Sequence, residues 1–165
     1  MTLIKDVARK AAELALDEHW DGQLPVDPVK IARALGMSIW LADLPDNESG
    51  LISKRAGEPA AIYLNKNEPP SRQNFTCAHE LGHWYERDSV ADDEYSFVDR
   101  RDDRPKDAHE WYAEHFAANL LMPMRAFIQA VDDGLPLWEL ETKFGVSRAA
   151  AGNRARNLGL KLNAA

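Results

Sequence analysis

The sequence predicts a mostly helical α+β fold, and three observations lead to this expectation. Apolar residues recur at helical spacing in seven segments of the chain. Short β-prone runs gather in a single stretch between residues 37 and 65. Prolines, glycines and capping residues separate these segments. With 165 residues, of which 45% are hydrophobic, the chain suits one compact domain with a small appendage.

The N-terminal part of the chain supplies two helices and the predicted sheet. Residues 3–19 space their apolar side chains helically. A second helix is expected within residues 26–36, where Asp27 is the N-cap, Pro28 takes the first helical position and Gly36 ends the helix. A small three-stranded sheet is expected from the β-prone runs, which are residues 37–44, 49–55 and 60–65.

Two longer helices and a charged segment are expected next. After the break at residues 67–71, Ser71 can cap a helix that ends near Glu86. Residues 86–107 hold nine acidic and five basic residues with little periodicity, which predicts a solvated loop. Another helix should then cover residues 106–121.

The C-terminal part should contain three short helices. Pro123 and Pro136 each suit the first turn of a helix, and Ser147 suits the N-cap of the last one. The expected division places the main domain at residues 1–135. A helix-turn-helix-like segment at 136–165 is expected to pack on that domain.

Composition excludes several classes of protein. The net charge of −7 argues against whole-surface attraction to nucleic acid or anionic lipid. The single cysteine, Cys77, excludes an internal disulfide, and no apolar run approaches the roughly 18 residues of a membrane span. The first twenty residues are helical and acidic rather than typical of a signal peptide, so a cytoplasmic location is expected.

The stretch "FTCAHELGHWYERD" at residues 75–88 suggests a metal site. His79 and His83 lie four residues apart, so on a helix both imidazoles can reach one zinc ion. Glu80 points about 100° away from that face and can take a proton from zinc-bound water, whose pKa falls to roughly 7. The alternative is an ordinary helix with two solvated histidines. The apolar neighbours disfavour that alternative, because neutral histidines on an apolar helix need a partner.

A catalytic zinc site needs a third protein ligand, and the later segment "HEWYAEHFAANLLMP" offers four candidates. They are His109, Glu110, Glu114 and His115. Glu110 is preferred because it lies at the edge of the face that the apolar residues mark as buried. Glu114 is then expected to accept a hydrogen bond from a ligand imidazole, unless it is simply an exposed helix charge.

These two segments together resemble the ImmA/IrrE family of zinc metallopeptidases. "RQNFTCAHELGHWY" followed about 30 residues later by "EWYAEHFAANLLMP" is similar to that family's FTxAHELGH and ExxAxxFAxxLLMP helices, and the likeness extends over nearly the whole chain. It implies a zincin-like fold with one zinc ion, held by His79, His83 and Glu110, and Glu80 as general base. Cys77 stands where the family usually has an aliphatic residue, and is interpreted as a small core residue.

The resemblance implies regulated proteolysis, in which an antirepressor or stress regulator cleaves a helix-turn-helix transcriptional repressor. Substrate would pair with an exposed edge strand, for which residues 60–67 are the expected candidate. A donor that stabilises the oxyanion is also needed. The choice remains open among four residues of the two helices, with His115 slightly favoured: Tyr85, His109, Tyr112 and His115.

The C-terminal segment supports a rival function. Residues 140–160 read as helix, turn and helix, with Gly145 at the turn and Arg148, Arg154 and Arg156 on the second helix, as in a DNA-binding module. The acidic remainder of the chain and the single copy of the segment argue against direct DNA binding. A zinc-bearing regulator that binds its partner without cleaving it is the other alternative. No membrane partner is expected.

Overall fold

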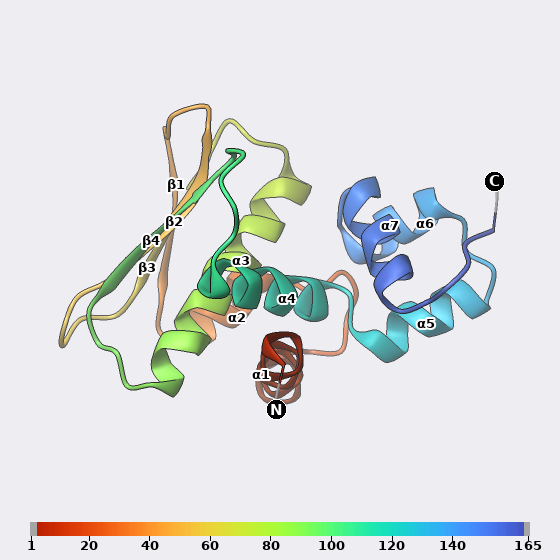
Figure 1. The fold of residues 1–165 in the computed structure, drawn as a ribbon, viewed down its shortest axis with the longest axis horizontal. Helices are drawn as coiled ribbons and strands as arrows, with labels where there is room; N and C mark the ends of the chain where they lie inside the picture. Colours follow the sequence, from red (N-terminus) through yellow and green to blue (C-terminus); the bar gives the residue numbers. More distant parts are fainter. Residues whose placement is uncertain (1–2, 164–165) are drawn as a thin grey trace.

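The computed structural model describes residues 3–163 and confirms a mixed α+β fold of seven helices and four strands (Figure 1). The helices are α1 (Ile4–His19), α2 (Pro28–Ala34), α3 (Pro70–Ser89), α4 (Ala108–Leu121), α5 (Met124–Asp132), α6 (Leu137–Phe144) and α7 (Arg148–Asn157). The strands are β1 (Ser38–Ala42), β2 (Glu48–Lys54), β3 (Ala61–Asn65) and β4 (Tyr95–Arg100). None of the described helices combines the length and the apolar character that crossing a membrane requires.

The sheet has one strand more than the sequence predicts. Its order is β1-β3-β2-β4, with β1 parallel to β3 and with β2 antiparallel to both β3 and β4. Strand β4 lies inside residues 86–107, so the prediction of a solvated loop across that whole segment was wrong. Ile52 of β2 pairs with Phe97 of β4. This pairing with a distant strand, rather than the composition of the segment, forms β4.

The strand order also corrects the expected position of the exposed edge. Residues 60–67 contain β3, which is central because it pairs with β1 on one side and β2 on the other. The two edges are β1 and β4. An added peptide strand therefore cannot extend the sheet at β3, whose backbone groups are already paired.

Capping residues set two of the predicted helix starts. Asp27 accepts hydrogen bonds from the first-turn amides of α2, and Ser147 accepts one from the first turn of α7. The prediction of Ser71 as a cap was wrong, because α3 already begins at Pro70 and its N-cap residue makes no side-chain hydrogen bond. A proline at the first helical position has no amide hydrogen to satisfy, which reduces the need for a cap.

Helices α3 and α4 cross closely in the centre of the molecule, between the sheet and α1 (Figure 1). Gly82 allows this approach, since a Cβ atom there would lie 2.9 Å from the Cα of Ala113 and 3.1 Å from the Cβ of Phe116. Isoleucines 52 and 62 of the sheet are fully buried beneath α3. The crossing places the middle of α3 beside the first turns of α4.

Helices α5, α6 and α7 gather at the end of the molecule away from the sheet (Figure 1). Phe127 of α5 and Phe144 of α6 are fully buried, with ring centroids 5.2 Å apart. Arg154 of α7 fastens this group to the end of α4, because its guanidinium donates to the Met122 carbonyl and to Asn119 Oδ1. The expected boundary between residues 135 and 136 stays a prediction.

Candidate metal centre

The structure brings His79, His83 and Glu110 together from two helices. His79 and His83 lie one turn apart on α3, with ring centroids 5.0 Å apart, and both side chains are buried. Glu110, in the first turns of α4, places Oε2 3.1 Å from His79 Nε2 and Oε1 3.2 Å from His83 Nε2. One potential ligand atom from each residue lies within 4.8 Å of the others. Two imidazoles and one carboxylate form a donor set that suits zinc.

Burial and hydrogen bonding shift the pKa values of Glu110 and His83. Burial by itself opposes the ionisation of Glu110, but hydrogen bonds with His79 and His83 outweigh it and lower the pKa of Glu110. Burial also lowers the pKa of His83, although Glu110 opposes that shift. The favoured state is a carboxylate with a neutral His83 imidazole, which is the protonation state that metal ligation requires.

The sheet contacts the ring of His83 through a stacked aromatic side chain. Phe97 of β4 stacks on it with ring centroids 4.2 Å apart and an interplanar angle of 2°. His83 Nδ1 is buried and has no hydrogen-bond partner in the described part of the chain. Strand β4 therefore orients a candidate ligand, although the composition of residues 86–107 predicts a loop rather than a strand.

Glu80 is a buried carboxylate without a partner. Its exposure is 0%, and neither oxygen has a hydrogen-bond partner among residues 3–163. Burial, followed by the charges of Asp99 and Glu110, raises its pKa well above the ordinary value. An unpaired carboxylate in this environment is unfavourable. A divalent cation held by the neighbouring histidines would offset that repulsion, so the orphaned carboxylate fits a metal site.

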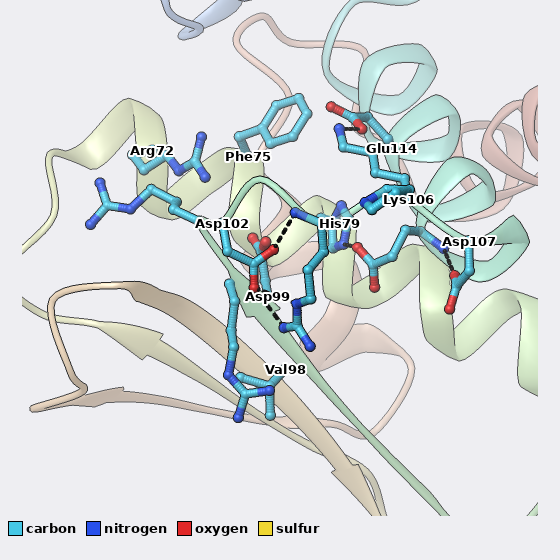
Figure 2. Close-up of a pocket in the computed structure, with 14 residues that line it drawn as sticks. Arg72, Phe75, His79, Val98, Asp99, Asp102, Lys106, Asp107 and Glu114 are labelled. Atoms are coloured by element: carbon cyan, nitrogen blue, oxygen red, sulfur yellow. Dashed lines mark hydrogen bonds and ion pairs between the residues drawn. The ribbon is translucent and has the colours of Figure 1, made fainter.

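A cleft of about 420 Å³ opens beside His79 and Glu110 (Figure 2). One wall is the end of β4 and the charged segment that follows it, and the other comes from α3 and α4. The lining includes five cationic side chains that the sequence analysis did not single out: Arg72, Arg100, Arg101, Arg104 and Lys106. The basic residues just before the helix of Glu110 are the available signal, but the charge and low periodicity of residues 86–107 predict a solvated loop instead.

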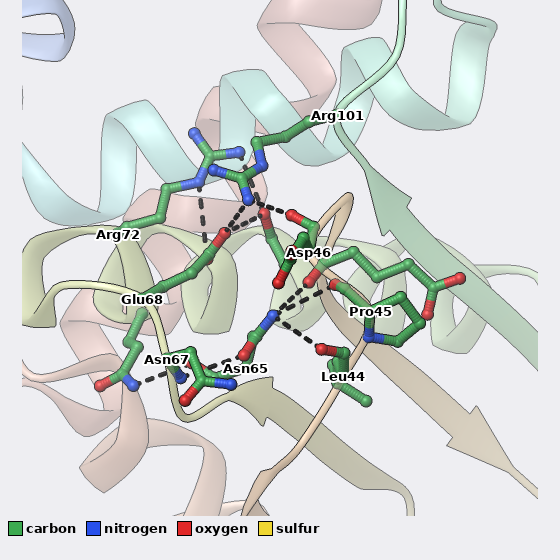
Figure 3. A network of polar contacts seen from close by, with 11 residues as sticks. Leu44, Pro45, Asp46, Asn65, Asn67, Glu68, Arg72 and Arg101 are labelled. Atoms are coloured by element: carbon green, nitrogen blue, oxygen red, sulfur yellow. Dashed lines mark hydrogen bonds and ion pairs between the residues drawn. The ribbon is translucent and has the colours of Figure 1, made fainter.

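Buried polar contacts position two of these arginines at the cleft (Figure 3). Glu68 has a side-chain exposure of only 5% and places Oε1 3.1 Å from Arg101 Nη2. The same oxygen accepts a hydrogen bond from the Ser49 hydroxyl at 3.1 Å. Arg72 Nη2 donates to that hydroxyl at 3.3 Å. Because Glu68 precedes α3 and Arg101 follows β4, this network connects the two walls of the cleft.

Glu114 does not have the expected partner. Its carboxylate pairs with Lys106, and within residues 3–163 it accepts no hydrogen bond from His79 or His83. Glu114 lies one turn beyond Glu110 on α4, at the margin of the cleft rather than beside the imidazoles. Its expected role as an acceptor for a ligand imidazole is therefore not supported by the contacts.

The four candidate oxyanion donors lie away from this cleft, whose lining in the described part of the chain includes none of them. Tyr85 stacks on Phe116 and Tyr112 is buried, and burial raises the pKa of each tyrosine to about 12. His109 Nδ1 lies 2.8 Å from Glu86 Oε1.

His115 also lies outside the lining of the cleft, and its ring stacks on Trp111.

Cys77 lies in the hydrophobic core, as the sequence predicts. It is fully buried, and burial raises the pKa of its thiol. Cys77 is thus a core residue, as predicted, and it is not part of the histidine and glutamate cluster.

Comparisons with known proteins extend these observations. Residues 32–156 match the peptidase family described as the IrrE N-terminal-like domain. None of the curated proteins matches the sequence. Among solved structures, a Mycobacterium tuberculosis transcriptional regulator matches with a TM-score of 0.63 and 21% identity, over 90% of this chain and 46% of that chain. At this identity the likeness shows the fold, and the chain spans less than half of that regulator. Because the family match covers well over half of its length, this chain belongs to the IrrE N-terminal-like peptidase family.

Proposed function

We propose that the protein is a zinc-dependent endopeptidase that cleaves a specific protein partner. The observation that carries this proposal is the unpartnered, fully buried carboxylate of Glu80 beside the cluster of His79, His83 and Glu110. These three residues would hold one zinc ion per chain, as expected from their donor types. When bound, zinc polarises the carbonyl that is attacked and makes a water molecule more acidic.

Glu80 would act as the general base and then as the general acid. Its carboxylate takes a proton from the water that attacks the carbonyl carbon of the substrate, and returns that proton to the departing amine. Burial keeps the carboxylate away from bulk water, which strengthens its interaction with the developing charge. Glu110 and the neutral imidazoles of His79 and His83 would fix the position of the metal.

Strand β4 replaces residues 60–67 as the proposed docking strand for substrate. It is an edge strand, and Val98, Asp99 and Arg100 at its end line the cleft. An extended peptide could pair with its free backbone edge and pass in front of the metal cluster. Lys106, which lines the same cleft, replaces the four earlier candidates as the proposed stabiliser of the oxyanion.

The proposed partner is a helix-turn-helix transcriptional repressor, cleaved by this protein as an antirepressor or stress regulator in the cytoplasm. Membership in a peptidase family supports hydrolysis. The likeness to a chain described as a transcriptional regulator supports a regulatory setting. A cleaved repressor would release its genes irreversibly, which suits a response to stress.

Glu80→Gln tests the proposed chemistry without removing a ligand. The variant should bind as much zinc as wild type, and cleavage should fall by roughly 10²-fold to 10⁴-fold because the general base is lost. The first measurement is the zinc content of both proteins. The second is cleavage, detected as new N-termini when each zinc-loaded protein is incubated with a proteome-derived peptide library. Fragments of a co-expressed helix-turn-helix repressor would then test the proposed partner.

Glu13→Gln is the matched control, because Glu13 is exposed on α1 and, among residues 3–163, pairs only with Arg9. It should leave cleavage unchanged. If wild type and Glu80→Gln inactivate the repressor equally, and neither yields fragments, the protein acts by binding rather than by hydrolysis.

A further inference from the structure

A second cavity, of about 530 Å³, lies between α7, α4 and the start of α3. We call it the α4–α7 groove. Its volume is within the range of pockets that bind small ligands or peptide segments, roughly 300–1,000 Å³. Its lining includes Trp111 and Met122, and Ala149, Asn153 and Arg154 of α7.

The α4–α7 groove adjoins the cleft beside His79 and Glu110. Arg72, Phe75, Lys106 and Glu114 line both cavities. Figure 2 shows Arg72, Phe75 and Glu114 along the upper margin of the cleft. The Lys106 and Glu114 pair joins the segment after β4 to α4 at this shared margin. A chain that leaves the cleft on this side therefore meets the margin of the groove.

The floor and walls of the groove suit apolar side chains. Phe75 and Met122 contribute apolar surface, and Trp111 remains 48% exposed although it faces a cavity. Helix α7 contributes the short side chains Ala149 and Asn153, which leave the space open. Exposed tryptophan in a concave surface is typical of sites that bind peptide side chains.

The charges around the groove favour an acidic ligand. Three cationic residues, Arg72, Lys106 and Arg154, line it together with the carboxylate of Glu114. Lys106 pairs with Glu114, and Arg72 Nε lies 3.9 Å from Glu68 Oε2, so the cation left for a ligand is Arg154. Arg154 is 6% exposed and donates to uncharged oxygens of Met122 and Asn119, so no carboxylate in the described part of the chain neutralises it directly. Burial accordingly lowers its pKa to about 10, which leaves it charged at neutral pH.

We propose that the α4–α7 groove is a second substrate-binding site, which holds an apolar segment with a neighbouring acidic residue several positions from the scissile bond. The occupant is the polypeptide that the metal centre cleaves, so the inference rests on the proposed function. Helix α7 would thereby select the substrate. This role uses the helix-turn-helix-like segment for protein recognition.

The test uses binding, which requires no turnover. Zinc-loaded Glu80→Gln protein is used to select from random twelve-residue peptides displayed on phage. The selected peptides should share apolar or aromatic residues next to Asp or Glu. Ala149→Trp, which fills the groove from α7, should weaken their binding at least tenfold, and Asn153→Trp should do the same from the next turn. Lys143→Trp is the matched control on exposed α6 surface and should change nothing.

Nuclear magnetic resonance gives a second measurement. Peptide binding should shift the indole signal of Trp111 and leave that of Trp138 in place, because the two are 48% and 55% exposed but only Trp111 lines the groove. Failure to select any peptide, or equal binding to Ala149→Trp, would overturn the proposal. If Ala149→Trp cleaves substrate as well as wild type does, the groove is not a substrate-binding site, and the proposed peptidase activity stands. If peptides bind in the groove but wild type cleaves nothing, the peptidase activity is wrong and the groove stands as a binding site.

Discussion

Glu110 and Glu114 lie on successive turns of α4 and have different partners. Glu110 contacts His79 and His83, whereas Glu114 pairs with Lys106. One helical turn is about 5.4 Å, which exceeds the reach of a ligand bond. A single turn therefore separates a residue that can hold the metal from one that forms the margin of the cleft.

Zinc content should distinguish these two glutamates. Purified wild type should contain about one zinc per chain. Glu110→Ala should lose most of it, since two imidazoles alone hold zinc weakly, and Glu114→Ala should retain it. Elemental analysis after dialysis against a weak chelator provides the measurement. Equal loss from both variants, or from neither, would show that Glu110 is not the third ligand.

At the scale of elements, the cluster of His79, His83 and Glu110 depends on how closely α3 and α4 approach. Gly82 lies at the crossing, next to His83 in sequence, and faces Ala113 and Phe116. Glu110 is one turn before Ala113. The distance between the helices thus sets the distance from Glu110 to the imidazoles.

Gly82→Ala should destabilise the protein. Alanine favours a helix by about 1 kcal/mol over glycine. Here its Cβ would lie 2.9 Å from the Ala113 backbone, and overpacking typically costs about 1–3 kcal/mol. Urea denaturation should therefore show a net loss of unfolding free energy, together with weaker zinc binding as Glu110 moves away.

Gly152→Ala is the control for this substitution. Gly152 lies within α7, and a Cβ there would meet nothing within 4 Å. The free energy of unfolding should therefore rise by the gain in helix propensity, about 0.5–1 kcal/mol, because no steric clash offsets it. Stabilisation of both variants would mean that the α3–α4 crossing can relax.

At the scale of the whole molecule, the C-terminal segment is joined to the end of α4 through Arg154. It has the helix, turn and helix of a DNA-binding module, with Gly145 at φ +63° in the turn. Arg154 is buried against the end of α4, so only Arg148 and Arg156 of the three expected arginines are exposed. The exposed Ala149 and Asn153 line the α4–α7 groove.

We therefore expect no sequence-specific binding of duplex DNA at physiological salt. A mobility-shift assay with wild type should show at most weak binding that salt removes, and Arg148→Gln with Arg156→Gln should have little further effect. Arg154 is kept in this test because its replacement would break contacts with Met122 and Asn119. A tight, specific shift that the double variant abolishes would contradict this interpretation.

The sequence alone predicted the helices and the local part of the candidate site. The spacing of His79, Glu80 and His83 determines their relative positions on any helix, because helical geometry is local. The apolar pattern of residues 108–121 similarly indicated that Glu110 borders a buried face. These predictions needed no knowledge of distant segments, although metal ligation itself stays a prediction.

Only the tertiary structure decided which edge of the sheet borders the site, which cations line the cleft and which arginine of α7 is buried. Strand β4 forms because β2 offers it a partner, and Arg154 is buried because the end of α4 offers it oxygen acceptors. Such pairings depend on segments far apart in the chain. The stabilising free energy arises only when the two segments are in contact, and neither segment shows it by itself. The composition of residues 86–107 therefore could not reveal a strand.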